Sequence, residues 1–190
     1  MIEPGGQFQN PETATEPLLM FRCAPAIQPY LAEDASGSII IDTRITNSKI
    51  AGTTPIQSSS FEKMMRSGLR VSVSVDGRTL ATGRVPPNAS AHELSFSLAP
   101  LKPRSDEFTV ECVAQTDDGQ TFGTNTTLLR LPNRTDGGSV TKMDFRTGAM
   151  LVKNETTKTW ETLFPLGFYT SFGGYLETNL TVLDDLKQRG

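Results

Sequence analysis

Leu69-Arg70-Val71-Ser72-Val73-Ser74-Val75, followed at once by Asp76-Gly77, is the stretch that decides the fold of this chain. Apolar and polar side chains alternate strictly along it, which is typical of a strand with one buried face. Asp-Gly is a strong signal for a type I′ turn, and Thr79 to Val85 can return as the partner strand. The stretch therefore predicts an antiparallel hairpin that lies on a hydrophobic core.

Short strand-like segments of the same kind surround this hairpin, at residues 38–45, 94–98, 108–114 and 121–131. Strands at this spacing, separated by turn formers, predict a mainly β chain with an antiparallel, immunoglobulin-like β-sandwich over residues 17–131. No Trp lies between Cys23 and Cys112, which excludes a true antibody-type domain. Residues 58–67 predict a loop, with a single helical turn as an alternative. Pro-, Gly- and Glu-rich residues 1–16 predict a disordered segment.

Cys23 and Cys112 are the only cysteines of the chain. An even number fits one disulfide in a secreted domain, and such a bridge would join two strands that are distant in the sequence. The alternative is a pair of buried free thiols. The cysteines therefore favour, without requiring, an oxidising compartment.

Asparagine usage points to the same compartment, because five of the seven asparagines begin an Asn-x-Ser/Thr sequon. We expect glycosylation at Asn88, Asn125, Asn133 and Asn154, and a secreted, extracellular location. Residues 1–6 have neither the basic nor the apolar region of a signal peptide, so this location requires a signal peptide that the printed sequence lacks. The alternative is an intracellular structural β protein in which the sequons occur by chance.

The C-terminal part of the chain has a different pattern. Residues 132–162 predict a turn-rich linker and a β-hairpin that lead into the apolar run Leu163 to Tyr169, which suits a strand buried on both faces of a parallel sheet. Tyr175 to Arg189 predicts an amphipathic helix with a leucine stripe. Residues 163–190 therefore look like the first strand and helix of a (β/α)₈ barrel that the chain does not complete.

Two expectations depend on that unit. In a full-length barrel, Tyr169, Thr170 and Ser171 would lie at the C-terminal end of the first strand, on the substrate side. Asn179 would fall inside the apolar arc of the helix, so we expect its sequon to be unoccupied. Without a barrel to join, the exposed apolar surface of residues 163–190 predicts self-association.

Composition and motifs exclude several classes of function. A net charge of −3 argues against a nucleic-acid surface, and the sequence has no apolar stretch of membrane-spanning length. A single histidine, His92, and two cysteines are too few for a zinc site, so we expect neither a metal nor a cofactor. The sequence contains no nucleophile elbow, phosphate-binding loop or dinucleotide fingerprint, and no catalytic residue can be assigned.

Several segments, 22–27, 48–54, 138–144, 164–170 and 174–176, resemble secreted fungal glycoside-hydrolase-like proteins, which have an N-terminal β-sandwich followed by a TIM barrel. The resemblance implies a non-catalytic accessory domain of a protein that acts on carbohydrate, inactive as the isolated chain. Family carboxylates would come from later barrel strands. The alternative is a stand-alone extracellular module that binds carbohydrate or a protein partner, with Tyr30, Trp160 and Tyr169 or Tyr175 as its candidate aromatic residues.

Overall fold

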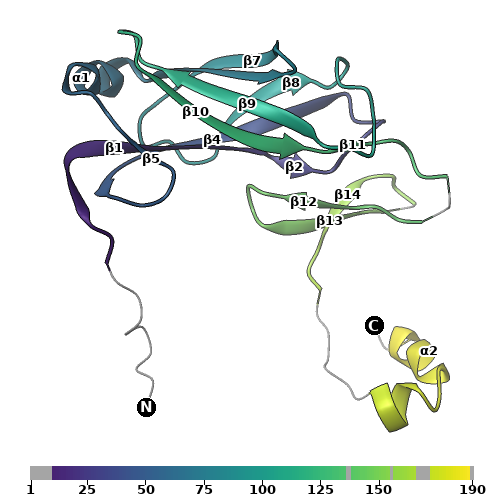
Figure 1. The fold of residues 1–190 in the computed structure, drawn as a ribbon. Coiled ribbons are helices and arrows are strands. Elements are labelled where there is room, and N and C mark those ends of the chain that lie inside the picture. Colours follow the sequence, from purple (N-terminus) through teal and green to yellow (C-terminus); the bar gives the residue numbers. More distant parts are fainter. Residues whose placement is uncertain (1–9, 136–137, 155, 166–171, 189–190) are drawn as a thin grey trace, which may run out of the picture.

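Two four-stranded antiparallel sheets face each other across the hydrophobic core, as expected of a β-sandwich (Figure 1). The computed structural model describes residues 10–135, 138–154, 156–165 and 172–188. The first sheet has the order β5-β1-β4-β8, with β1 (Thr13–Pro25), β4 (Ser36–Ser48), β5 (Thr53–Pro55) and β8 (His92–Ser97). The second has the order β10-β9-β6-β7, with β6 (Leu69–Val75), β7 (Arg78–Val85), β9 (Phe108–Gln115) and β10 (Thr121–Leu128).

The predicted hairpin is confirmed as β6 and β7. The valines of β6 are buried and the residues between them are exposed or half-buried, as the alternation requires. Asp76 and Gly77 both have a positive φ, at 50° and 73°, which is the conformation of a type I′ turn. The turn and the alternation together set the register of the second sheet.

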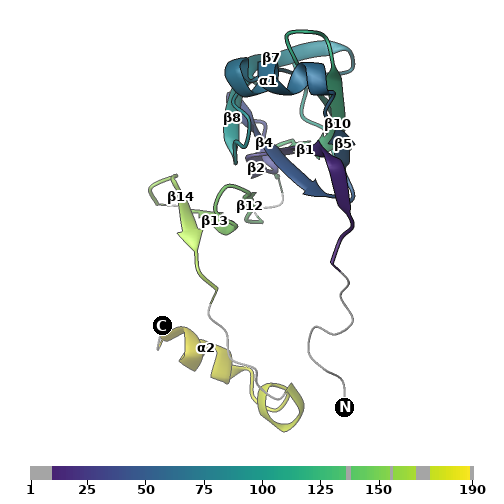
Figure 2. The ribbon, with the colours of Figure 1, turned by 90° about the vertical axis from the view of Figure 1, so that its left-hand side faces the viewer.

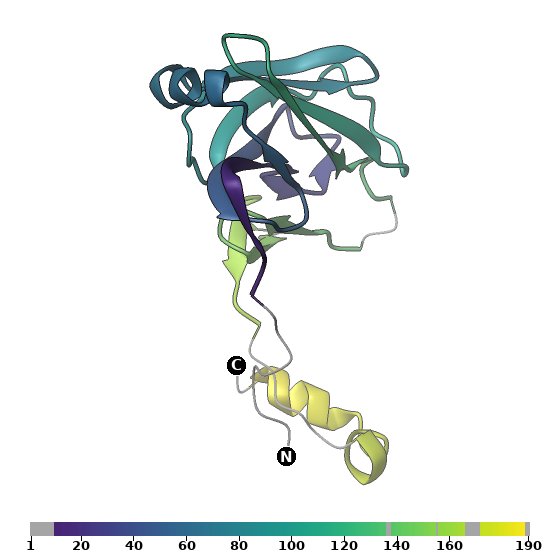
Figure 3. The same cartoon turned by 60° about the vertical axis from the view of Figure 1, so that its left-hand side comes forward.

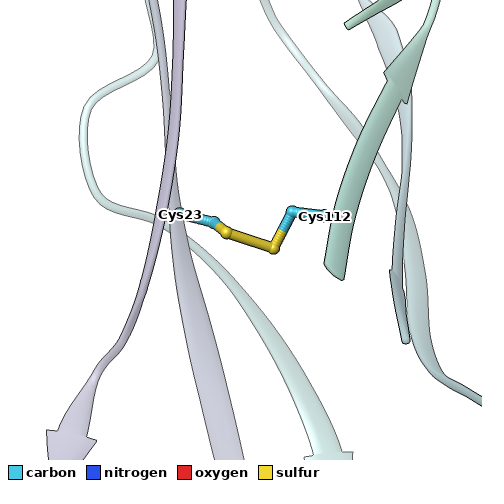
Figure 4. Close-up of a disulfide and its surroundings, with 2 residues drawn as sticks. All are labelled: Cys23 and Cys112. Atoms are coloured by element: carbon cyan, nitrogen blue, oxygen red, sulfur yellow. A yellow bond between two sulfur atoms is a disulfide. The ribbon is translucent and has the colours of Figure 1, made fainter. Parts of the chain in front are cut away.

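A disulfide between Cys23 of β1 and Cys112 of β9 crosses the core from one sheet to the other (Figure 4). The predicted pairing is therefore confirmed, and the alternative of two free thiols is wrong. The bridge lies in the core: Cys23 pairs across the first sheet with buried Ile41, and Cys112 pairs across the second with buried Val73. The bridge links residues 89 positions apart, and so ties the first strand of the sandwich to a late one.

The segment predicted to be a loop forms helix α1 (Ser58–Ser67), which covers one end of the sandwich (Figure 2). Met64 is fully buried and joins the helix to the core. Ser60 donates a hydrogen bond to Asp118, in the turn between β9 and β10. The helix has no side-chain cap at its N-terminal residue Gln57. Its sequence signal is weak for that reason, and tertiary packing stabilises it.

Strand β1 begins earlier than the sequence predicts. Thr13 pairs with Ser48, and the register shifts between Thr13 and Leu18. The expected disordered segment 1–16 is therefore wrong for residues 13–16, because pairing with β4 extends the strand. Residues 1–9 lie outside the described residues.

A third sheet is attached to one end of the sandwich and has the order β14-β13-β12-β2 (Figures 1 and 3). Its strands are β2 (Ile27–Gln28), β12 (Thr141–Asp144), β13 (Ala149–Lys153) and β14 (Trp160–Leu163), and we call it the small sheet. The hairpin expected within residues 132–162 is confirmed as β12 and β13. Nearby, β3 (Tyr30–Leu31) pairs in parallel with β11 (Arg130–Leu131).

Arg130 holds the connections at this end of the sandwich together. Its guanidinium is buried and donates hydrogen bonds to five backbone carbonyls. The acceptors belong to Leu31, Ala32, Asp34, Leu98 and Leu101. One side chain therefore fixes the β3–β4 loop against the segment that follows β8.

The C-terminal segment differs from the expected strand and helix. Leu163 ends an antiparallel strand, opposite Met150, rather than opening a buried parallel one. The rest of the predicted strand, with Tyr169, Thr170 and Ser171, lies mostly outside the described residues. The short segment η1 (Phe172–Leu176), which is kinked at Gly173 and Gly174, precedes helix α2 (Thr181–Gln188). None of the described helices is long and apolar enough to span a membrane.

Helix α2 is shorter than predicted because Asn179 precedes it and accepts a hydrogen bond from the Thr181 amide at 3.0 Å. Asparagine is among the residues preferred at this capping position. The interpretation of Asn179 as part of the apolar arc is therefore wrong. In Figure 3, α2 lies apart from the sheets, and Leu180, Leu183 and Leu186 are exposed.

Candidate functional site: a cavity beside Trp160

Buried charges fix the small sheet to the sandwich. The Lys142 ammonium lies 2.9 and 2.7 Å from the two carboxylate oxygens of Asp34, and its side chain is only 3% exposed. The same ammonium lies 4.2 Å from the centroid of the Trp160 ring. Asp34 also accepts a hydrogen bond from the Leu31 amide. We call this contact between the β3–β4 loop and strands β12–β14 the joint.

A second group of charges supports the joint near β8. Arg146 contacts Asp144 through two hydrogen bonds and forms an ion pair with Glu93 at 3.5 Å. The hydrogen bonds from Arg146 hold the pKa of the Asp144 carboxyl below its usual value of 3.8. The small sheet is therefore connected to the sandwich at two places by charged side chains.

A cavity of about 250 Å³ opens beside the joint. Trp160, the only tryptophan of the chain, forms part of its wall and is half-buried. Lys153 and Glu33 also line it and form an ion pair at 2.6 Å. Asn133 and Arg134 line it from the connection that follows β11. The cavity thus combines an aromatic side chain, a charged pair and a glycosylation sequon.

A larger cavity of about 500 Å³ lies beside the start of β1, between residues 13–18 and 49–55. Threonine and aliphatic side chains account for most of its wall, together with Glu16 and Lys49. None of its lining residues is aromatic. The Trp160 cavity is therefore the stronger candidate for binding a sugar.

The outer face of the small sheet carries an apolar row that faces solvent. Met143 pairs with Met150, and Met150 pairs with Leu163, so that the three side chains lie on one face. Met143 is 37% and Leu163 40% exposed. On β12 the polar residues Lys142 and Asp144 are buried instead. The usual arrangement of a half-buried strand is thus reversed, because Lys142 pairs with Asp34 in the joint and Asp144 pairs with Arg146.

The sequon asparagines have different environments. Asn125 on β10 and Asn133 are exposed, and exposed Asn88 accepts a hydrogen bond from the Ile45 amide. Half-buried Asn154 donates its side-chain amide to Glu161 at 2.8 Å and accepts from the Thr156 amide. Within the described part of the chain, glycosylation therefore encounters no protein partner at the amide of Asn125, but competes with Glu161 at Asn154.

The structure places the other sequence-predicted residues as follows. Tyr30 is 4% exposed and hydrogen-bonds through its hydroxyl to the Ser38 backbone, and burial raises its pKa. It therefore cannot serve as a surface platform. Tyr169, Thr170 and Ser171 lie outside the described residues. Among the residues that the structure describes, no group of three or more His, Cys, Asp or Glu side chains could hold a metal ion.

Sequence reasoning identified Trp160 but missed Asp34 and Lys142, which form the joint with it, and Arg130, which holds the β3–β4 loop that carries Asp34. Asp34 and Lys142 are 108 positions apart, so no local pattern links them. The only sequence signal for a buried charge is in β12, where Lys142 and Asp144 alternate with Thr141 and Met143.

No family model, curated protein or solved structure matches this chain. The resemblance to secreted fungal glycoside-hydrolase-like proteins therefore stays a prediction.

Proposed function

We propose that this chain is the non-catalytic accessory part of a secreted protein that acts on carbohydrate, and that its small sheet packs against a second body. The apolar row Met143–Met150–Leu163 carries the proposal. One face of the small sheet is fixed to the sandwich by the joint, whereas the other exposes apolar side chains that would be stabilised by burial. A sheet fixed on one face and apolar on the other suits a rigid attachment between two bodies.

The residues that follow β14 also expose apolar side chains. Phe164 is 79% exposed, and the leucines of the α2 segment are exposed as well. In the proposed arrangement, these side chains pack within a (β/α)₈ barrel, and Tyr169, Thr170 and Ser171 lie on its substrate side. Catalytic carboxylates would come from that barrel, so the isolated chain is inactive.

Two features support export of the chain. The disulfide between the sheets is typical of secreted domains, and Asn125 and Asn133 expose their sequons to solvent. In a protein that passes through a glycosylating pathway, both sites are accessible without unfolding.

The intact mass of the naturally produced protein, measured before and after enzymatic deglycosylation, tests the proposal. We expect a deglycosylated mass far above the 20.7 kDa of the chain. We also expect no polysaccharide hydrolysis by the purified chain alone. A natural mass near 20.7 kDa, or turnover by the isolated chain, would contradict the accessory role.

The Trp160 cavity favours a second candidate function, a stand-alone module that binds carbohydrate. Indole rings offer an apolar face for sugar rings, and Lys153 and Glu33 offer hydrogen-bonding groups beside it. Polysaccharide pull-down with Trp160→Ala tests this function, with Val113→Ala as a control because Val113 is exposed on the sandwich. Retention that falls for Trp160→Ala alone supports the module, and equal retention contradicts it.

A further inference from the structure

Asn133, the first residue of a glycosylation sequon, lines the same cavity as Trp160. A glycan at Asn133 would require the export proposed above. We propose that the cavity is the seat of an N-glycan attached to Asn133, so that the protein fills this site with its own sugar. The glycan's first residues would lie against Trp160. The occupant is then a modification of the chain rather than a substrate.

The sequon is held at the cavity by its own middle residue. Arg134 lines the cavity and donates a hydrogen bond to the Ser139 carbonyl at 3.2 Å. A Cβ atom at Gly138 would come within 2.5 Å of the Arg134 guanidinium, so a larger residue there would force the end of this side chain to move. Arg134 therefore links the Asn133 segment to the segment around Ser139, which leads into Gly138 and Val140 on the same cavity wall. The exposed Asn133 side chain remains accessible for modification.

The size and chemistry of the cavity suit one or two sugar rings. Its volume of about 250 Å³ lies below the range of about 300–1,000 Å³ typical of small-molecule pockets. Sugar hydroxyls can exchange hydrogen bonds with the Lys153–Glu33 pair, while the apolar face of a ring packs on the indole. Lys142 contacts the Trp160 ring but does not line the cavity. The buried ammonium thus holds the indole without occupying the space.

The other sequons do not offer this combination. The cavity at Asn88 has no aromatic residue in its wall, and Asn125 lies on the exposed strand β10. Asn154 engages its amide with Glu161. Of the sequon asparagines that the structure describes, Asn133 is the one that shares a cavity wall with an aromatic side chain.

Fluorescence of Trp160 tests the inference, because it is the chain's only tryptophan. The full chain is secreted from a glycosylating host, and acrylamide quenching is compared among three variants. Thr135→Ala removes the Asn133 sequon, whereas Thr135→Ser keeps it. Thr127→Ala removes the sequon of Asn125 and controls for the loss of a distant glycan.

We expect glycan on Asn133 by glycopeptide mapping. The quenching constant should rise by about twofold in Thr135→Ala, because one face of the indole loses its cover. It should remain unchanged in Thr135→Ser and Thr127→Ala. Enzymatic deglycosylation of the unaltered chain should reproduce the rise.

Different results separate the two proposals. Glycan at other sequons with Asn133 unmodified, or unchanged quenching in Thr135→Ala, overturns the glycan seat and leaves export intact. Absence of glycan from every sequon of the naturally produced protein overturns both. Protection of Trp160 by added soluble polysaccharide in the fully glycosylated chain also overturns the seat, because it shows the cavity to be open to an external ligand.

Discussion

Replacement of Lys142 by methionine should loosen the joint, because methionine keeps the apolar stem but removes the ammonium. The Lys142 side chain is 3% exposed and that of its partner Asp34 is 21% exposed. Breaking a fully buried ion pair costs roughly 3–5 kcal/mol. Since water reaches part of the Asp34 carboxylate, we expect a loss of about 2–3 kcal/mol in the free energy of unfolding of the small sheet.

Trp160 allows this loss to be measured locally. Urea unfolding followed by its fluorescence reports the joint, while far-UV circular dichroism reports mainly the strands of the sandwich. The fluorescence transition should move to lower urea in Lys142→Met. Lys153→Met is the matched control, because the Lys153–Glu33 pair is more exposed, at 25% and 41%. Its loss should stay below about 1 kcal/mol.

A double-mutant cycle distinguishes a lost ion pair from lost packing. Asp34→Asn removes the negative charge that is left unpaired in Lys142→Met. It keeps a side-chain oxygen that can accept the hydrogen bond from the Leu31 amide. Combined with Lys142→Met it should recover most of the stability, because removal of both charges leaves neither unpaired. Equal losses in Lys142→Met and Lys153→Met, or no recovery in the double variant, would refute the reasoning.

Three further predictions concern the sandwich and its surface. The double variant Cys23→Ala/Cys112→Ala removes the disulfide. By the loop-closure relation, its free energy of unfolding should be lower by about 4–5 kcal/mol. A loss below about 1 kcal/mol, measured by urea titration, would contradict this prediction. The Asp144 carboxyl, whose pKa is lowered by Arg146, contributes stability above its unfolded pKa of about 3.9 that is lost as the pH falls through the folded value. Asp144→Asn should therefore flatten the fall in urea midpoint as the pH is lowered below about 5, and an unchanged slope would oppose this assignment. Glycopeptide mapping should find lower occupancy at Asn154 than at the exposed sequon of β10, and equal occupancy would contradict competition with Glu161.

The parts of the fold that could be predicted from sequence are those with a local physical signal. The alternation of β6 and the Asp76-Gly77 turn identify a hairpin without any knowledge of its surroundings. The spacing of strands and the even cysteine count led to the sandwich and its bridge. The hairpin residues are neighbours in the chain. The two cysteines can form only one disulfide within the chain.

The missed parts depend on distant partners. Helix α1 lacks a side-chain cap, and burial of Met64 against the core stabilises it. The joint depends on Asp34, which meets Lys142 only after the chain has formed the sandwich. On β12, Lys142 is buried and Met143 is exposed, which is the reverse of what hydrophobicity alone favours. Local periodicity contains no information on such a pairing.

The contacts of Arg130 also determine which parts of this end of the molecule are free to vary. All five of its acceptors are main-chain oxygens, which every amino acid possesses. Positions such as Ala32 can therefore change their side chains without loss of the anchor, whereas Arg130 cannot be exchanged for lysine, which lacks the planar set of five donors. The exposed positions of these loops can therefore carry different side chains, provided that Arg130, the joint residue Asp34 and the buried side chains of Leu98 and Leu101 are kept.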